Sequence, residues 1–268
     1  MSLAHSNIAV DKALELLRST GPSTPEYLCF HALAITNVKG PLAVRLVDSL
    51  LGGDPRFCRL GDGRWDLAAA GSPTVDLLSG SYVVVDVETT GFSPPADRVI
   101  EIGMVRVESG RIIAYYESLI NPRRPVPGPI TSLTGISYSM LSSQPTFDQV
   151  CPEIVDFLGD SVFVAHNAPF DWRFVQNEVV LSTGRKLLNR RLCTRALARK
   201  LVPELERRNL DELARFFNLS FSARHRAMVD AEVTAELLLR LCERARDLGI
   251  EDQAGLFALV APKRRGKA

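Results

Sequence analysis

The stretch Ser81–Gly91 reads SYVVVDVETTG and decides the fold of most of the chain. Its run of β-branched residues is typical of a buried strand. Residues i and i+2 of a strand point to the same face, so Asp86 and Glu88 project side by side with Val87 turned into the core. Two carboxylates this close repel each other unless a cation lies between them. A solvated pair of acids is the alternative, but the strand and the Thr-Thr-Gly turn favour a metal site.

Alternating strand and helix patterns follow this strand. We expect further strands over residues 98–107, 111–120, 161–165 and 191–194, and helices over residues 147–158, 170–181, 209–217 and 227–246. Three meander strands followed by strands that alternate with helices predict an α/β domain, in which helices flank a mixed five-stranded sheet. We place this domain at residues 81–248, followed by a C-terminal extension at 249–268.

A separate small α+β domain is expected before this region. Three helical patterns, at residues 10–18, 26–35 and 41–51, precede apolar residues that flank the turn signal Gly61-Asp62-Gly63. Three helices and a two-stranded wing resemble a winged-helix domain, which we place at residues 1–72, with a linker at 73–80. Winged helices bind DNA, protein or neither. With seven basic and eight acidic residues before residue 81, DNA binding and protein docking remain equally open.

Composition excludes several classes of protein. The chain has 268 residues and a net charge of +1, so any basic surface must be local. Five cysteines, none in a CxxC pair, argue against a disulfide framework or a zinc knuckle and fit a reducing cytoplasm. The N-terminus carries Asp11, Lys12 and Glu15 within an amphipathic pattern, so it does not resemble a signal peptide. No apolar run approaches the roughly 20 residues that a membrane span needs, so we expect no membrane contact.

A second motif is HNAPFDWRF, which runs from His166 to Phe174. A short strand delivers His166 and Asn167 to a turn, and Pro169 opens a helix where its missing N–H costs nothing. Asp171 then falls in the first turn of that helix. Taken alone, this acid could merely stabilise the helix dipole, which contributes about 0.3–1 kcal/mol.

A third motif is HRAMVDAEVT, which runs from His225 to Thr234. Asp230 lies on the amphipathic helix expected over residues 227–246. Five residues of a helix turn by about 500°, so His225 would point away from the face of Asp230 if both were helical. We therefore expect His225 in the loop before the helix, where it can approach a substrate. The alternative is a surface histidine in an arginine-rich loop.

Together, the three motifs resemble the DEDDh branch of the DnaQ-like 3′→5′ exonuclease family over residues 81–245, and the motif set is most similar to that of the proofreading epsilon subunit of bacterial DNA polymerase III. The matching residues are Asp86, Glu88, Asp171, His225 and Asp230. EIG at residues 101–103 and LTGIS at 133–137 also match. The tyrosine branch would have Tyr at position 226, which here is Arg226. The resemblance implies a ribonuclease H-like fold.

The resemblance also implies a mechanism. The four carboxylates would hold two divalent ions, Mg²⁺ or Mn²⁺, which prefer oxygen ligands. His225 would accept a proton from the attacking water, and the reaction would release a nucleoside 5′-monophosphate. Thr89 would meet the terminal nucleotide and Leu133 would wedge against its base. His166 and Asn167 would support the site, although satisfying the turn backbone is an equal alternative for both.

The expected partner is nucleic acid, in particular single-stranded DNA with a free 3′ end, in proofreading, repair or end processing. Twelve bases against four acids between Arg185 and Arg226 give a local charge of +8, which suits a polyanion or a solvated face. The basic tail at 262–268 would add non-specific affinity. Two alternatives stay open: a 3′→5′ exoribonuclease, and an inactive nucleic-acid-binding or scaffold protein. The sequence leaves open whether a polymerase or a repair complex is a partner.

Overall fold

The structure is a computed structural model that describes residues 3–54, 56–60, 62–67, 76–220 and 225–261. The chain divides into two compact units, Met1–Thr74 and Val75–Ala268. The expected tail at 262–268, Gly61 of the expected turn and residues 73–75 of the expected linker lie outside the described residues.

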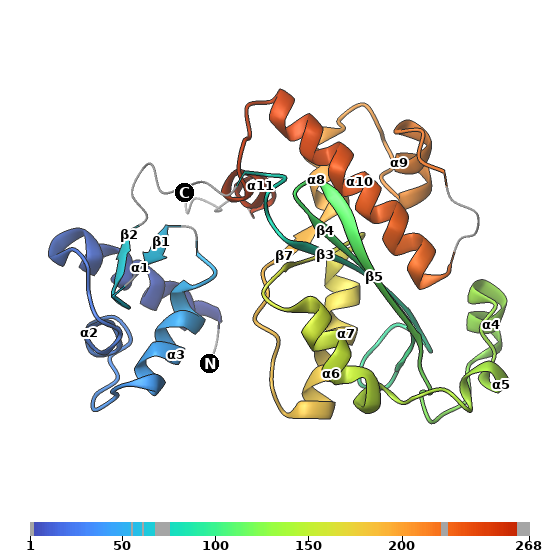
Figure 1. Cartoon of the computed structure of the whole chain (residues 1–268), viewed down its shortest axis with the longest axis horizontal. Helices are drawn as coiled ribbons and strands as arrows, with labels where there is room; N and C mark the ends of the chain where they lie inside the picture. Colours follow the sequence, from blue (N-terminus) through green and yellow to red (C-terminus); the bar gives the residue numbers. More distant parts are fainter. Residues whose placement is uncertain (1–2, 55, 61, 68–75, 221–224, 262–268) are drawn as a thin grey trace. The chain divides into compact units, whose positions relative to one another are not determined.

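The first unit contains three helices and a β-hairpin (Figure 1). In chain order these are α1 (Leu3–Thr20), α2 (Pro25–His31), α3 (Pro41–Leu51), β1 (Phe57–Arg59) and β2 (Trp65–Leu67). Thr24 caps α2 by accepting a hydrogen bond from the N–H of Tyr27, and Pro25 and Pro41 open α2 and α3. The order of elements is the one expected, and its assignment as a winged helix remains a prediction.

Three arginines in and beside the β-hairpin of this unit form ion pairs. Arg56 binds Asp54 at 2.6 Å, and Arg59 binds Asp48 at 3.3 Å. Arg64 binds Asp62 at 2.8 Å. Both partners of the Arg59–Asp48 and Arg64–Asp62 pairs are exposed, and such pairs contribute about 0–1 kcal/mol.

The second unit is built on a mixed five-stranded sheet of order β5-β4-β3-β6-β7, which confirms the predicted α/β fold. Strand β3 pairs antiparallel with β4 and parallel with β6, β5 pairs antiparallel with β4, and β7 pairs parallel with β6. The elements are β3 (Tyr82–Thr89), β4 (Val99–Glu108), β5 (Arg111–Leu119), α4 (Gly128–Thr134), α5 (Tyr138–Leu141), α6 (Phe147–Leu158), β6 (Val162–Ala165), α7 (Ala168–Thr183), β7 (Arg191–Cys193), α8 (Thr194–Leu201), α9 (Leu210–Phe216), α10 (Ala227–Asp247) and α11 (Gln253–Val260).

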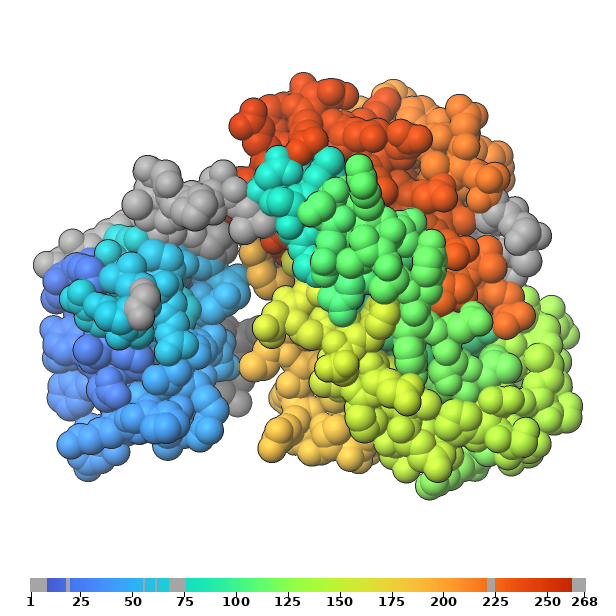
Figure 2. All heavy atoms as spheres, in the orientation of Figure 1, coloured from blue at the N-terminus to red at the C-terminus, as the bar shows by residue number. Residues whose placement is uncertain are grey.

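Helices cover both faces of this sheet (Figure 1). On one face Tyr82 and Val84 pack in a core with residues of α8, α9, α10 and α11. On the other, Val83, Val85 and Val87 pack with residues of α6 and α7. Because the alternation continues along β3, Asp86 and Glu88 belong to the face that α10 covers. Edge strand β5 is alternately exposed along its length and reaches the surface in Figure 2, where its green residues adjoin the orange-red α10.

Two segments outside the sheet pack on the same core. Leu77, in the stretch expected to be linker, is fully buried, and its N–H donates to the carbonyl of Glu251. Leu256, in the expected C-terminal extension, is also fully buried within α11. These contacts connect residues 76–80 and 250–260 to the second unit. Within the described chain, no helix combines the length and the apolar character that crossing a membrane requires.

Candidate active site

Strand β3 carries the first two carboxylates to the end of the sheet. Asp86 and Glu88 are half-buried, whereas their neighbour Val87 is buried. A register shift between Glu88 and Thr89 interrupts the regular pairing with β4 directly after these acids, and pairing resumes at Thr89 with Val99. The two carboxylates therefore project from the last residues of the strand.

The start of α10 brings the third motif to these acids. His225 lies before the helix with a φ of 62°, which confirms the expected loop position. Its backbone N–H donates to Oδ2 of Asp230 at 3.2 Å. One potential ligand atom from each of Glu88, His225 and Asp230 lies within 4.8 Å of the other two. The first and the third sequence motif therefore meet in the folded chain.

A glycine on β4 allows this approach. Gly103 is the register partner of Asp86. A Cβ at Gly103 would lie 2.4 Å from the backbone C of Ala227 and from the N of Met228. Only a residue without a side chain lets the first turn of α10 lie this close to the sheet.

A buried carboxylate, that of Glu101, holds the start of α10 in place. Glu101 is 3% exposed and accepts hydrogen bonds from the N–H of Ala227 at 2.9 Å and from the Arg226 guanidinium at 2.7 Å. The pairing raises the pKa of Arg226 above its ordinary value, chiefly through the hydrogen bond to Glu101. The sequence motif EIG contains both Glu101 and Gly103, yet the residue pattern gave neither residue a role.

Asp171 enters the site from the other side of β3. It is 3% exposed at the first turn of α7. Burial, with a smaller contribution from the charge of Glu88, raises the pKa of Asp171 to about 8, although hydrogen bonds from its own N–H and that of Val87 act in the opposite direction. The Val87 N–H lies between Asp86 and Glu88 in the chain, so Asp171 is held against the strand that carries both.

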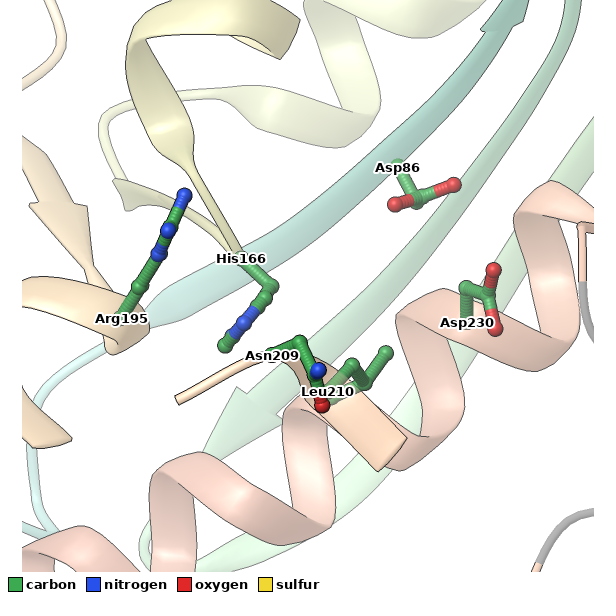
Figure 3. A pocket seen from close by; sticks show the side chains of 6 residues that line it. All are labelled: Asp86, His166, Arg195, Asn209, Leu210 and Asp230. Atoms are coloured by element: carbon green, nitrogen blue, oxygen red, sulfur yellow. The ribbon is translucent and has the colours of Figure 1, made fainter. Parts of the chain in front are cut away.

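A pocket of about 230 Å³ opens beside these groups. Figure 3 shows Asp86 on β3 and Asp230 on α10 at one end, with His166 and Arg195 farther along. Asn209 and Leu210 complete the lining. We call this the catalytic pocket.

The remaining predicted site residues have different positions. Thr89 is buried and its hydroxyl donates to the carbonyl of Gly91, whereas Leu133 on α4 is 50% exposed. Asn167 is exposed with a φ of 85°. None of these three lines the catalytic pocket. Both ring nitrogens of His166 lie within hydrogen-bonding distance of protein groups, Thr194 Oγ1 at 2.9 Å and the Arg208 carbonyl at 3.1 Å.

The donor set fits divalent metal ions. Carboxylate oxygens are the ligands that Mg²⁺ and Mn²⁺ prefer, and the His225 ring lies beside them. The repulsion between Asp171 and Glu88 is of the kind that a bound cation relieves. The site geometry therefore agrees with a metal centre formed by the three motifs.

Comparison with known proteins agrees with this geometry. The RNase_T family model, described as Exonuclease, matches residues 83–238. DNA polymerase III subunit epsilon of Aquifex aeolicus is 39% identical over 168 residues, which cover 63% of this chain and 83% of that protein. The PolC-type DNA polymerase III of Clostridium perfringens is 40% identical over 177 residues, which cover 64% of this chain but only 12% of the polymerase.

Among solved structures, exonuclease X in complex with 5′ overhanging duplex DNA is similar, with a TM-score of 0.55 and 25% identity over 67% of this chain and 99% of that one. Members of the matched family generally use divalent metals. On the family match and the epsilon relative together, this chain belongs to the DnaQ-like exonuclease family, whose members hydrolyse nucleic acid.

Proposed function

We propose that this protein is a 3′→5′ exonuclease that removes nucleoside 5′-monophosphates from DNA 3′ ends. The observation that carries the proposal is the convergence of the motif residues. Glu88, His225 and Asp230 lie within 4.8 Å by their ligand atoms, Asp86 lines the same pocket as Asp230, and Asp171 interacts with Glu88. Carboxylates from three separate chain segments are unfavourable together unless the protein binds a cation there.

The carboxylates are the proposed metal ligands. Asp86, Glu88, Asp171 and Asp230 would hold two divalent ions, Mg²⁺ or Mn²⁺. When bound, such ions neutralise charge on a phosphodiester and lower the pKa of a water molecule. Asp171 must lose its proton to act as a ligand, because burial holds it partly protonated near neutral pH.

His225 is the proposed general base. Histidine side chains exchange protons near neutral pH, and this one lies outside the helix next to Asp230. Its backbone N–H is fixed by the Asp230 carboxylate while its ring remains partly exposed. The ring can therefore accept the proton of an attacking water without unfolding the start of α10.

The loop after β3 is the proposed contact for the terminal nucleotide. Thr89 holds the loop closed by donating to Gly91, and the next residue, Phe92, is 71% exposed. The carbonyl of Phe92 accepts a hydrogen bond from Arg173, two residues after Asp171. Phe92 thus offers an exposed aromatic ring for a base, and we propose Leu133, which is half-exposed on α4, as an apolar contact for the terminal base. His166 would support the site through its contacts with Thr194 and the Arg208 carbonyl, and Asn167 through its position at the N-cap of α7.

The cellular role follows from the relatives. The epsilon relative is a subunit of DNA polymerase III, so we propose proofreading or repair with a polymerase or repair complex as partner.

A gel assay tests the proposal. Single-stranded DNA, matched duplex and RNA, each labelled at the 5′ end, are incubated with Mg²⁺, Mn²⁺ or EDTA, and with the Asp86→Ala variant beside the wild type. We expect a ladder that shortens from the 3′ end on DNA and that is absent in EDTA and in the variant. Retained binding with no degradation in either metal would favour the inactive scaffold alternative.

A further inference from the structure

A second hollow adjoins the catalytic pocket. It has a volume of about 310 Å³ and is lined by Arg195, Arg199, Glu206, Arg207, Arg208 and Asn209. We call it the arginine groove. Arg195 and Asn209 line both the groove and the catalytic pocket, so the two hollows share a wall.

The groove carries a strong excess of positive charge. Four guanidinium groups face one carboxylate, that of Glu206. Arg195 and Arg199 are four residues apart on α8, and therefore share one face of that helix. Among the residues that the structure describes, no ion pair or side-chain hydrogen bond involves Arg195, Arg199 or Arg207. Each of the three is exposed.

Other arginines of the same unit are paired. Arg98 binds the buried Glu178 at 2.6 Å, and Arg244 binds Glu204 at 2.8 Å. Like charges gathered without counter-charges repel one another, which is unfavourable unless the groove binds an anion. The contrast indicates a groove for a ligand with several negative charges.

The groove walls are held in place by the protein itself. His166 lies within hydrogen-bonding distance of Thr194 at the start of α8 and of the Arg208 carbonyl in the facing loop. Arg208 donates to the carbonyls of Val202, at 3.2 Å, and Glu206, at 3.1 Å, while its buried Nε has no hydrogen-bond partner among the described residues. A groove arranged before its ligand arrives binds with a smaller entropic cost.

We propose that the arginine groove binds the phosphodiester backbone of the strand being degraded, on the 5′ side of the scissile bond. This inference rests on the proposed function. If the 3′-terminal nucleotide occupies the catalytic pocket, the strand can continue only in the 5′ direction, and the groove is a hollow that shares two residues with that pocket. Guanidinium groups bind phosphates through paired hydrogen bonds, and such phosphate contacts carry no information about the base, so DNA and RNA backbones share this chemistry.

The test uses the full-length Arg199→Ala/Arg207→Ala variant, because these two residues line the groove and not the catalytic pocket. The control is Arg111→Ala/Arg185→Ala, which removes the same charge from exposed positions on β5 and after α7. Substrates are single-stranded DNA, single-stranded RNA and the nitrophenyl ester of thymidine 5′-monophosphate. The ester contains a phosphodiester but no nucleotides on the 5′ side.

We expect KM for both oligonucleotides to rise about 10- to 100-fold in the groove variant, because two charge-assisted contacts are lost. The ratio of kcat/KM for the oligonucleotides to kcat/KM for the ester should fall by a similar factor. The slope of log K against log salt concentration for oligonucleotide binding should become shallower by about 1.4, because two phosphate contacts are lost and each contributes about 0.7. The control variant should match the wild type in KM, in the ratio of oligonucleotide to ester hydrolysis and in the salt slope.

The inference is overturned if the groove variant loses ester and oligonucleotide hydrolysis equally, or if KM for the oligonucleotides is unchanged. Fluorescence anisotropy of labelled oligonucleotides in EDTA separates this result from a failure of the proposed function. If the wild type cleaves nothing but the groove variant binds more weakly than the control, the groove stands and the exonuclease proposal fails. Equal binding by variant and control refutes the groove.

Discussion

Replacing Gly103 by alanine tests how the start of α10 is placed over β3. In the structure an added Cβ would lie 2.4 Å from two backbone atoms, those of Ala227 and Met228. Backbone atoms cannot rotate away as the end of a flexible side chain can. Reaching an ordinary contact of about 3.4–4 Å requires the helix and the strand to separate by roughly 1 Å or more.

This separation acts on the site directly. Gly103 is the register partner of Asp86, while Asp230 lies in the first turn of the displaced helix. A displacement of about 1 Å between groups that act together reduces turnover about 100-fold. Overpacking of this kind also destabilises a core by about 1–3 kcal/mol. We therefore expect Gly103→Ala to lower kcat about 100-fold in a protein that still folds.

The measurement is kcat for single-stranded DNA in Mg²⁺, together with thermal unfolding followed by circular dichroism. Turnover is compared at a temperature where both proteins are folded. Gly128→Ala is the matched control, because a Cβ there would meet nothing within 4 Å. A kcat for Gly103→Ala within threefold of the wild type would refute the placement of α10 that we describe.

Three further predictions concern single side chains. The raised pKa of Asp171 means that the metal-free fold loses stability as pH rises from about 4 to 8, so Asp171→Asn should stabilise the protein in EDTA more at pH 8 than at pH 4; urea unfolding at the two pH values checks this, and equal effects at both would contradict it. His225→Ala should lower kcat about 10²- to 10⁴-fold and change KM little; a variant whose kcat stays within threefold of the wild type would remove His225 from the mechanism. Glu178→Gln should destabilise the fold by about 3–5 kcal/mol, because Arg98 would lose its 1%-exposed partner; a free energy of unfolding within 1 kcal/mol of the wild type in urea would show that the pair contributes little.

The sequence alone determined the class of fold and the motif positions. The β-branched run of β3 needs burial on both faces, and the period of two places Asp86 and Glu88 on one side of it. The strong amphipathic pattern after His225 predicted α10, and the turn of a helix placed His225 outside it. These conclusions depend on local geometry, which a stretch of about ten residues can specify.

Four short helices were not predicted from the sequence. They are α4, α5, α8 and α11, with 7, 4, 8 and 8 residues, whereas α2 and α9, with 7 residues each, were expected. Isolated helices of this length are marginal in water, so tertiary contacts decide whether they form. Leu256 of α11, which is fully buried in the core of the second unit, is an example.

Only the tertiary structure decided how the site is held together. Glu101 accepts hydrogen bonds from residues 125 and 126 positions later in the chain, and no local pattern specifies such a partner. The raised pKa of Asp171 depends on burial and on the charge of Glu88. Likewise, the arginines that are spread along the sequence line one groove because α8 and the loop before α9 pack side by side, and His166 contacts both. Distances between segments far apart in the chain are set by packing, which composition and periodicity do not encode.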